Sequence, residues 1–152
     1  MSAASRIKLT DFILLLLRGL ELEGQKLLTG RTMAQKVIYL ITRDTPLRDA
    51  LGLHYRIHYY GPYSSEVTDA IGPLTAFGLV EEVPIRFTDF TRYDLRLTKQ
   101  GEDHSSKIYD GLPRAMKSQI DSMAREGTKL NAMPLKKVIE KAYAQAKVEK
   151  LA

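Results

Sequence analysis

The chain has 152 residues, of which 44% are hydrophobic and 27% charged, a composition that suits one soluble globular domain with one or two appended helices. It contains no cysteine, which excludes disulfides, thiolate zinc sites and cysteine nucleophiles. The formal net charge of +5 favours a polyanionic partner only weakly, and the positive excess lies in the first 50 and the last 52 residues.

The first predicted element is a helix that begins at Thr10 or Asp11, whose side chains can cap it. The run Phe12–Leu17 is apolar nearly all round, so we expect it to be buried in the core or against a second subunit. It is far shorter than the ~20 residues that span a membrane. We therefore expect no membrane partner and a cytoplasmic protein. Residues 19–30 are predicted to form a turn-rich link.

A second helix is predicted to begin at Thr32, whose hydroxyl can cap it, and to end at Thr45-Pro46. Its apolar side chains recur at helical spacing and form one broad face. Gln35, Lys36 and Arg43 lie outside that face and are expected to point to water.

The centre of the chain reads as a strand, a turn and a third helix in close succession. Alternating side chains from His54 to Tyr60 predict a short strand, which Gly61-Pro62 should stop. Ser64 or Ser65 can cap the helix that follows. Gly78 is expected to end that helix as the left-handed residue beyond its last turn.

A hairpin and further helices are predicted after Gly78. Residues 79–82 begin a strand, residues 83–92 form the hairpin tip, and alternating side chains from Tyr93 to Leu97 mark the return strand. Two strands joined by an exposed loop make a wing. Thr98 to Gly101 then opens a helix.

The remaining chain is predicted to be helical. The helix after the wing should break at residues 111–113, a second helix should cover residues 114–125, and residues 127–133 should form a loop. Pro134 suits the start of a last helix. That helix has an apolar stripe with lysines elsewhere, a pattern that favours dimerisation with a second copy over a membrane surface.

Three segments carry a resemblance to a known family: Arg31–Tyr39 (RTMAQKVIY), His58–Ser64 (HYYGPYS) and the Leu74-x-x-Phe77-Gly78-Leu79-Val80 step. They resemble uncharacterised bacterial and archaeal proteins of the YwgA type and, more loosely, the Panacea domain of SocA-like antitoxins. The resemblance covers roughly residues 8–100. It implies a winged-helix-like domain with a regulatory role.

The predicted fold class is α+β and mostly helical. We expect a winged helix of three helices and a small antiparallel sheet with a wing hairpin, followed by two or three extra C-terminal helices. Residues 8–101 form the winged-helix-like domain in this interpretation, and residues 102–152 form a C-terminal helical extension used in packing or dimerisation.

The candidate binding residues follow from how such domains hold DNA. The third helix would lie in the major groove and the wing would touch phosphate. Because the third helix has no Lys or Arg, the cations must come from the wing, the second helix and the basic C-terminal helices. The predicted DNA contacts are Arg31, Lys36, Arg56, Tyr60, Ser64, Ser65, Thr68, Arg86, Arg92, Arg96 and Lys99.

The leading hypothesis is a DNA-binding transcriptional regulator, with an antitoxin-like role among its versions, that binds duplex DNA as a homodimer. The alternative is a winged-helix module that binds a protein partner with its acidic third helix and with the wing phenylalanines Phe87 and Phe90. The sequence offers no acid–base pair, no nucleophile with a base and no metal-ligand set. We therefore expect no enzyme activity, no metal and no cofactor.

Overall fold

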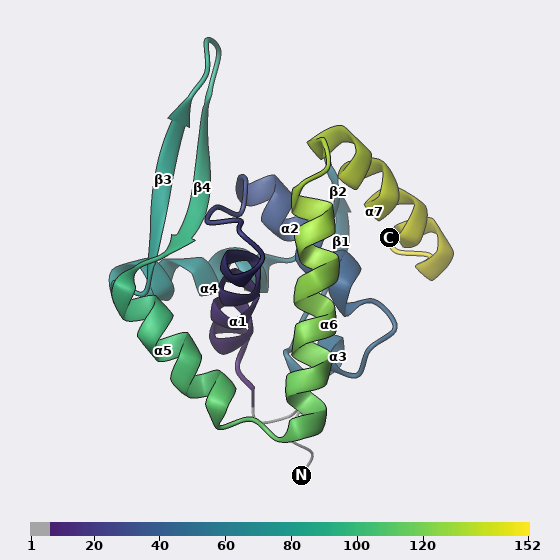
Figure 1. Ribbon diagram of the computed structural model, residues 1–152. Coiled ribbons are helices and arrows are strands. Elements are labelled where there is room, and N and C mark those ends of the chain that lie inside the picture. The colour runs from purple at the N-terminus through teal and green to yellow at the C-terminus, as the bar shows by residue number, and fades with distance from the viewer. Residues whose placement is uncertain (1–6) are drawn as a thin grey trace.

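The computed structural model describes residues 7–152 and has an α+β, mostly helical fold, as predicted (Figure 1). Two small antiparallel sheets accompany the helices, and none of the described helices is long and apolar enough to cross a membrane. The elements of this range are α1 (Leu9–Leu22), α2 (Arg31–Thr42), α3 (Leu47–Ala50), β1 (Arg56–His58), β2 (Gly61–Tyr63), α4 (Ser65–Ala76), β3 (Val80–Arg86), β4 (Thr91–Leu97), α5 (Lys99–Asp110), α6 (Arg114–Asn131) and α7 (Leu135–Glu149).

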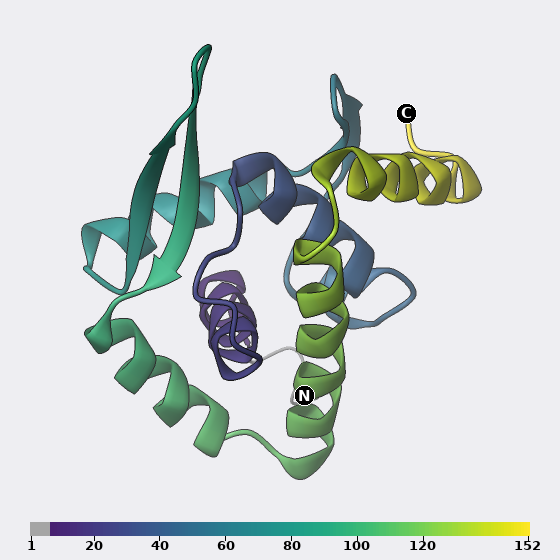
Figure 2. The ribbon, with the colours of Figure 1, turned by 45° about the horizontal axis from the view of Figure 1, so that its top comes forward.

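The core is centred on α1 and α2. Every side chain from Phe12 to Leu17 is buried, which confirms that this apolar run lies inside. Helices α5 and α6 pack on α1, whereas α6 and α7 pack on α2, so the C-terminal helices share a hydrophobic cluster with the N-terminal ones (Figure 2). The predicted division between residues 101 and 102 falls inside α5.

The prediction that residues 19–30 form a turn-rich link is wrong for its first part, because α1 continues through Gly19 to Leu22. A Cβ atom on Gly19 would lie only 2.3 Å from the Cβ atom of Ala124 in α6. The glycine therefore permits close packing of two helices and does not end the first one.

The predicted loop at residues 127–133 is also wrong in its first part, because α6 continues to Asn131. Gly127 is buried inside this helix, and a Cβ atom there would lie 3.0 Å from Cδ1 of Leu16. Like Gly19, Gly127 serves helix packing. The predicted break at residues 111–113 and the start of the last helix after Pro134 are confirmed.

The strand predicted from His54 to Tyr60 is shorter than expected, and Gly61-Pro62 does not end the pairing but begins β2. Strands β1 and β2 pair antiparallel, with His58 opposite Gly61. Tyr59 and Tyr60 form the turn between them. Gly61 has a φ of 102°, so the backbone angle that a side chain would disfavour falls on the residue without one.

Gln35 and Lys36 were expected to face water, and this prediction is wrong because both are buried where β2 covers α2. The Gln35 side chain donates to the carbonyl oxygen of Ser64 at 2.8 Å and accepts from the Ser64 amide at 2.9 Å. This pair of bonds ties α2 to the start of α4. Ser64 precedes α4 as predicted, but its hydroxyl donates to Glu66 and does not accept from the helix.

The end of α4 and the presence of a hairpin after it are confirmed, but the predicted tip at residues 83–92 is too long, because β3 continues to Arg86 and β4 begins at Thr91. Gly78 has a φ of 73°, and the Leu79 amide donates to the carbonyl oxygen of Leu74, the geometry of a left-handed helix end. Strands β3 and β4 pair antiparallel over seven residues each. Thr98 caps α5 by accepting from the Gly101 amide at 2.9 Å.

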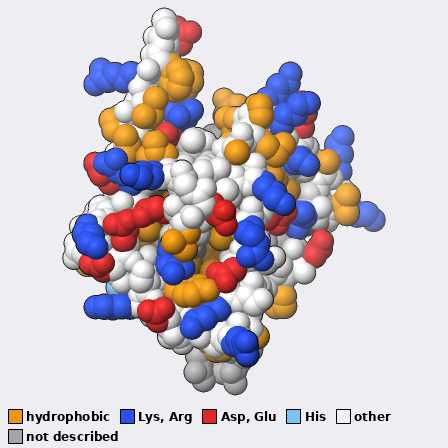
Figure 3. Space-filling view, in the orientation of Figure 1, with side chains coloured by type: hydrophobic (Ala, Val, Ile, Leu, Met, Phe, Trp, Pro, Cys, Tyr) orange, Lys and Arg blue, Asp and Glu red, His pale blue; other side chains and the backbone are white. Residues whose placement is uncertain are grey.

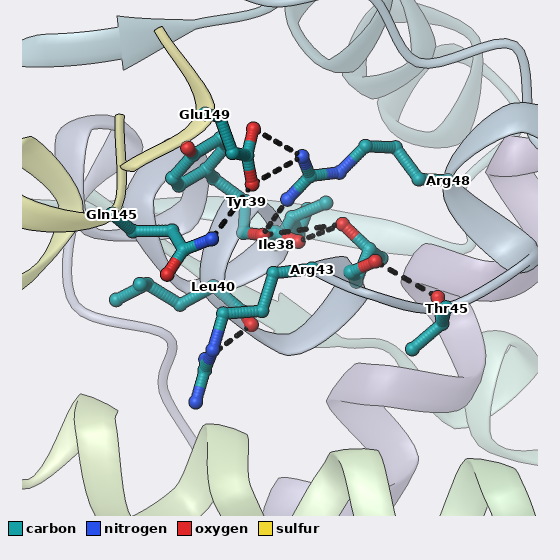
Figure 4. Close-up of polar contacts among 9 residues, drawn as sticks. Ile38, Tyr39, Leu40, Arg43, Thr45, Arg48, Gln145 and Glu149 are labelled. Carbon is teal, nitrogen blue, oxygen red and sulfur yellow. Dashed lines mark hydrogen bonds and ion pairs between the residues drawn. The ribbon is translucent and has the colours of Figure 1, made fainter. Parts of the chain in front are cut away.

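A partly buried ion pair joins the last helix to α3 (Figure 4). Arg48 donates to both carboxylate oxygens of Glu149, at 2.9 and 2.7 Å, and also to the carbonyl oxygen of Tyr39. Burial acts to raise the pKa of Glu149, but the hydrogen bonds from Gln145 and Arg48 and the charge of Arg48 outweigh it. The pKa of Glu149 is therefore lowered.

We expect Glu149→Gln to lower the free energy of unfolding by about 1 kcal/mol at pH 7, because glutamine keeps one acceptor but loses the charge. A carboxyl group with a lowered pKa stabilises the fold above its unfolded pKa and stops doing so as the pH falls through its folded pKa. The difference between wild type and variant, measured by urea unfolding, should therefore shrink below about pH 4.5. A difference that is constant from pH 7 to 3 would contradict this role.

Candidate interaction face

Both hairpins project from the same side of the molecule, with the start of α2 between them (Figure 2). Two depressions lie at this place, and Arg31 and Thr32 line both of them. The β1–β2 pocket has a volume of about 350 Å³ and is lined by Arg31, Thr32, Gln35, Lys36, His58, Tyr59, Tyr60, Tyr63 and Thr68. The β3–β4 pocket has a volume of about 390 Å³ and is lined by Thr29, Gly30, Arg31, Thr32, Met33, Phe90, Thr91, Arg92, Tyr93 and Leu135.

We call these two pockets, together with Phe87 at the hairpin tip, the hairpin face. Its aromatic side chains are unusually open to solvent: Tyr59 is 96% exposed, Tyr60 61% and Phe90 60%. The rings of Phe87 and Phe90 stack on each other at 4.8 Å instead of folding back onto the helices. A larger depression over α6, of about 970 Å³, has no aromatic side chain in its wall.

Two arginines of β4, together with Arg31 and Lys99, are paired with carboxylates of the same chain. Arg92 donates twice to Asp94, whose side chain is fully buried, and Arg96 lies 2.6 Å from Glu81, its partner in the strand register. Arg31 lies 2.6 Å from Glu82 and over the ring of Tyr93. Lys99 pairs with Asp103 at 3.2 Å. Four of the predicted phosphate-binding cations are thus already matched by an anion.

Lys36 is the one predicted DNA contact whose charge is buried; its side chain is only 2% exposed. Its Nζ atom donates to the carbonyl oxygen of Pro62 at 2.8 Å. Burial lowers the pKa of Lys36 to about 8. Within residues 7–152 no carboxylate oxygen lies within 4.0 Å of this ammonium group. Lys36 is therefore too buried to hold the phosphate backbone of a DNA duplex.

The residues predicted to contact DNA do not form one continuous surface, because some line the two pockets and others lie outside them. Arg31, Lys36, Tyr60 and Thr68 come together in the β1–β2 pocket, and Arg31 and Arg92 in the β3–β4 pocket. The Thr68 hydroxyl is bonded to Gln35 and Tyr63. Ser64 is buried, whereas Ser65, Arg56 and Arg86 are exposed outside both pockets. In the described part of the chain no carboxylate pairs with Arg56 or Arg86.

Sequence reasoning missed several residues of the face, above all Tyr59, Tyr93 and Thr32. Tyr59 was assigned to a strand, whereas it lies in the turn at the tip of the first hairpin. The signal was present, since two adjacent tyrosines precede a glycine that can adopt a positive φ. Residues 7–152 contain no group of three His, Asp or Glu side chains arranged to hold a metal ion.

Comparison with known proteins gives one informative relative. No family model matches the chain. It is 33% identical over 95 residues to the uncharacterized protein YwgA of Bacillus subtilis (strain 168), a match that covers 62% of this chain and 54% of that protein. The chain thus spans about half the length of this curated relative. The match supports the predicted relationship to YwgA-type proteins, and the relative's name states no activity.

Proposed function

We propose that the chain is a winged-helix module that binds a protein partner with its hairpin face. In this interpretation α1, α2 and α4 are the three helices of the winged helix, and β3–β4 is the wing. The order of elements along the chain and the YwgA relationship support this assignment. The looser resemblance to the Panacea domain belongs to the same proposal.

One observation carries the proposal: the aromatic side chains of the hairpin face are exposed while its arginines are paired internally. Tyr, Phe and Arg are enriched at the centres of protein interfaces, where aromatic rings contribute most of the binding energy. Phosphate binding instead needs cations that are free to replace counterions. Arg92 would have to leave the buried carboxylate of Asp94 to contact a phosphate, which would leave a buried charge without its partner.

The surface of α4, the third helix of the proposed winged helix, also favours a protein partner over DNA. Its exposed polar side chains are Ser65, Thr68 and Asp69, so this surface of α4 has no cation to hold a DNA backbone. Phe77, at the end of α4, is 76% exposed. An uncharged or acidic surface with an exposed ring is typical of a protein contact rather than a phosphate contact.

The second candidate function is the DNA-binding regulator that acts as a homodimer. The observation in its favour is the group of cations outside the hairpin face. Lysines gather over α7, on the right-hand side of the molecule (Figure 3), and Arg56 and Arg86 are exposed. The α7 lysines exposed to solvent are Lys136, Lys137, Lys141, Lys147 and Lys150.

We expect little binding of a fluorescein-labelled mixed-sequence duplex at either low or moderate salt, measured by anisotropy. The regulator function instead requires binding that weakens steeply with salt, because each neutralised phosphate releases about 0.9 counterion. Under that function Arg86→Glu combined with Lys137→Glu should remove the signal. Binding with this salt dependence and this sensitivity would overturn the module proposal.

The partner is tested by placing a photo-crosslinking amino acid at position 60 or 90 in cells that make the protein. Both positions should yield an adduct with one partner, and position 107 on the exposed side of α5 should yield none. Phe87→Ser should lower crosslinking from position 60 at least about tenfold, because central aromatic contacts contribute 2 kcal/mol or more. Leu22→Ser removes an apolar side chain outside the face that is more exposed than Phe87, 70% against 45%, and is the control.

A further inference from the structure

The β1–β2 pocket has a buried cation in its wall without a carboxylate to match it. Lys36 is almost completely buried, and among residues 7–152 its one hydrogen-bond partner is the carbonyl oxygen of Pro62, so two N–H groups of the ammonium are not used by these residues. A buried charge without a counter-charge is costly. Burial lowers the pKa of Lys36 to about 8. An anion in the pocket would provide the missing charge.

Four other residues of the wall carry planar rings, and the remaining ones are Arg31, Thr32, Gln35 and Thr68. His58 and Tyr63 lie against each other with ring centres 4.6 Å apart, and the exposed Tyr59 and Tyr60 continue the wall at the hairpin turn. Aromatic walls of this kind favour a flat ring that can stack on them. The volume of about 350 Å³ is in the range of small-molecule sites, and too small for a folded partner.

The pocket has a rigid frame. Gly61 brings the hairpin close to α7, where a Cβ atom on this glycine would lie 3.4 Å from the ring of Tyr143 and 3.7 Å from Cε of Lys36. The Tyr143 hydroxyl donates to the carbonyl oxygens of His58 and Tyr59 at 3.2 and 3.0 Å. These contacts join the hairpin turn to α7 beside Lys36.

We propose that the β1–β2 pocket binds a small organic anion in which a flat ring carries a carboxylate or phosphate group. The ring would stack on the tyrosines of the hairpin, and the anionic group would lie against Lys36, beside Arg31, which stays bonded to Glu82. The pocket is part of the hairpin face, so its ligand would share Tyr59 and Tyr60 with the proposed partner-binding surface. Its test needs no protein partner, so the two proposals can fail separately.

Several titratable groups surround Lys36, so the experiment must distinguish protonation of Lys36 from protonation of these neighbours. Arg31 comes from α2, His58 from β1, Tyr60 from the turn and Tyr63 from β2, and Tyr143 from α7 packs close to the Lys36 side chain. The described residues place no Asp or Glu in the pocket wall. A proton taken up on ligand binding near pH 8 should therefore go to Lys36, and His58→Gln serves as the control for the histidine.

The experiment is a titration of the full chain with 4-hydroxybenzoate and with AMP, followed by amide NMR shifts of residues around the pocket. At least one anion should bind with a dissociation constant below ~1 mM, which corresponds to about −4 kcal/mol. The uncharged analogues 4-hydroxybenzamide and adenosine should bind at least tenfold more weakly. Comparison of 4-hydroxybenzoate with AMP shows whether the site prefers a carboxylate or a phosphate group. The titration extends to 10 mM, roughly tenfold above the expected dissociation constant. The proposal is overturned if neither anion changes the amide NMR shifts within this range.

Two further readouts separate a ligand-binding role of Lys36 from a structural one. In wild type, calorimetry near pH 8 in HEPES and Tris should reveal net uptake of protons on anion binding, because burial lowers the pKa of Lys36 to about 8 and a bound anion would favour its protonated form. This needs no variant that could unfold. Lys36→Met should weaken anion binding at least tenfold and abolish the uptake, whereas His58→Gln should retain it. Anion binding without proton uptake, or equal binding by folded Lys36→Met, would contradict the role of Lys36.

Discussion

Gly101→Ala should lower the free energy of unfolding by about 3 kcal/mol, the upper part of the range for overpacking a tight site. A Cβ atom at this position would lie 1.9 Å from the carbonyl oxygen of Leu79 and 2.9 Å from its carbonyl carbon. Both are backbone atoms, so no side chain can rotate away. The Leu79 oxygen also accepts from the Thr98 amide, and that bond joins the end of α4 to the start of α5. For a chain of this size the thermal midpoint should fall by about 10 °C.

The matched control is Gly72→Ala. Gly72 lies inside α4, is exposed, and a Cβ atom there would meet nothing within 4 Å. Alanine favours a helix interior over glycine by up to ~1 kcal/mol. The ring of the following Pro73 disfavours the helical backbone of a preceding residue that carries a Cβ atom, which offsets this gain, so the variant should be close to wild type in stability. Calorimetry of the two variants compares the same chemical change with and without a backbone obstacle. Equal midpoints for both would show that the contact with Leu79 does not limit residue 101.

Gly19→Ala is expected to cost about 2 kcal/mol, and the change should be reversible by a second substitution. The added methyl group would lie 2.3 Å from the methyl group of Ala124, where α1 meets α6. Ala124→Gly alone should also destabilise the fold, by about 1 kcal/mol, because it adds a glycine to a helix interior. The double variant moves the methyl group from one helix to the other and should recover most of the loss.

This cycle of four proteins is measured by urea unfolding, and its coupling energy is the quantity of interest. Residues in direct contact couple by 0.5–3 kcal/mol, on the order of the loss expected here. If the double variant is as unstable as the sum of the two single variants, the two methyl groups do not oppose each other. The explanation of Gly19 as a packing residue would then be wrong.

The long elements of the fold were predictable because their signals are local. The apolar run after Thr10, the glycine at 78 and the alternation from Tyr93 to Leu97 each act within a few residues. The glycines at 19 and 127 misled the prediction for a physical reason. The sequence alone does not distinguish a glycine that ends a helix from a glycine that permits close contact with another helix. The distinction depends on which helix packs against it.

The candidate site was predictable only in part, because its state depends on pairs that are far apart in sequence. Arg96 and Lys36 both look like free cations in the sequence. The strand register places Glu81 opposite Arg96, and the first hairpin buries Lys36 beneath Pro62. Neither fact follows from composition or spacing. For the phenylalanines of the second hairpin the sequence left open whether they are exposed or fold back onto the domain, and the structure shows them exposed.

Asn131, the last residue of α6, has a consequence for the order in which the chain folds. Its side chain accepts from the Thr29 amide and hydroxyl and donates to Gln25 and to the carbonyl oxygen of Leu27, all more than 100 residues earlier. The connection between the first two helices is held by backbone bonds of Leu28 to Leu95 in β4, and it obtains this second anchor only after the sixth helix has formed. Contacts of such long sequence separation slow folding. During synthesis on a ribosome, the Asn131 contacts to this connection would form only after the C-terminal third of the chain has been made.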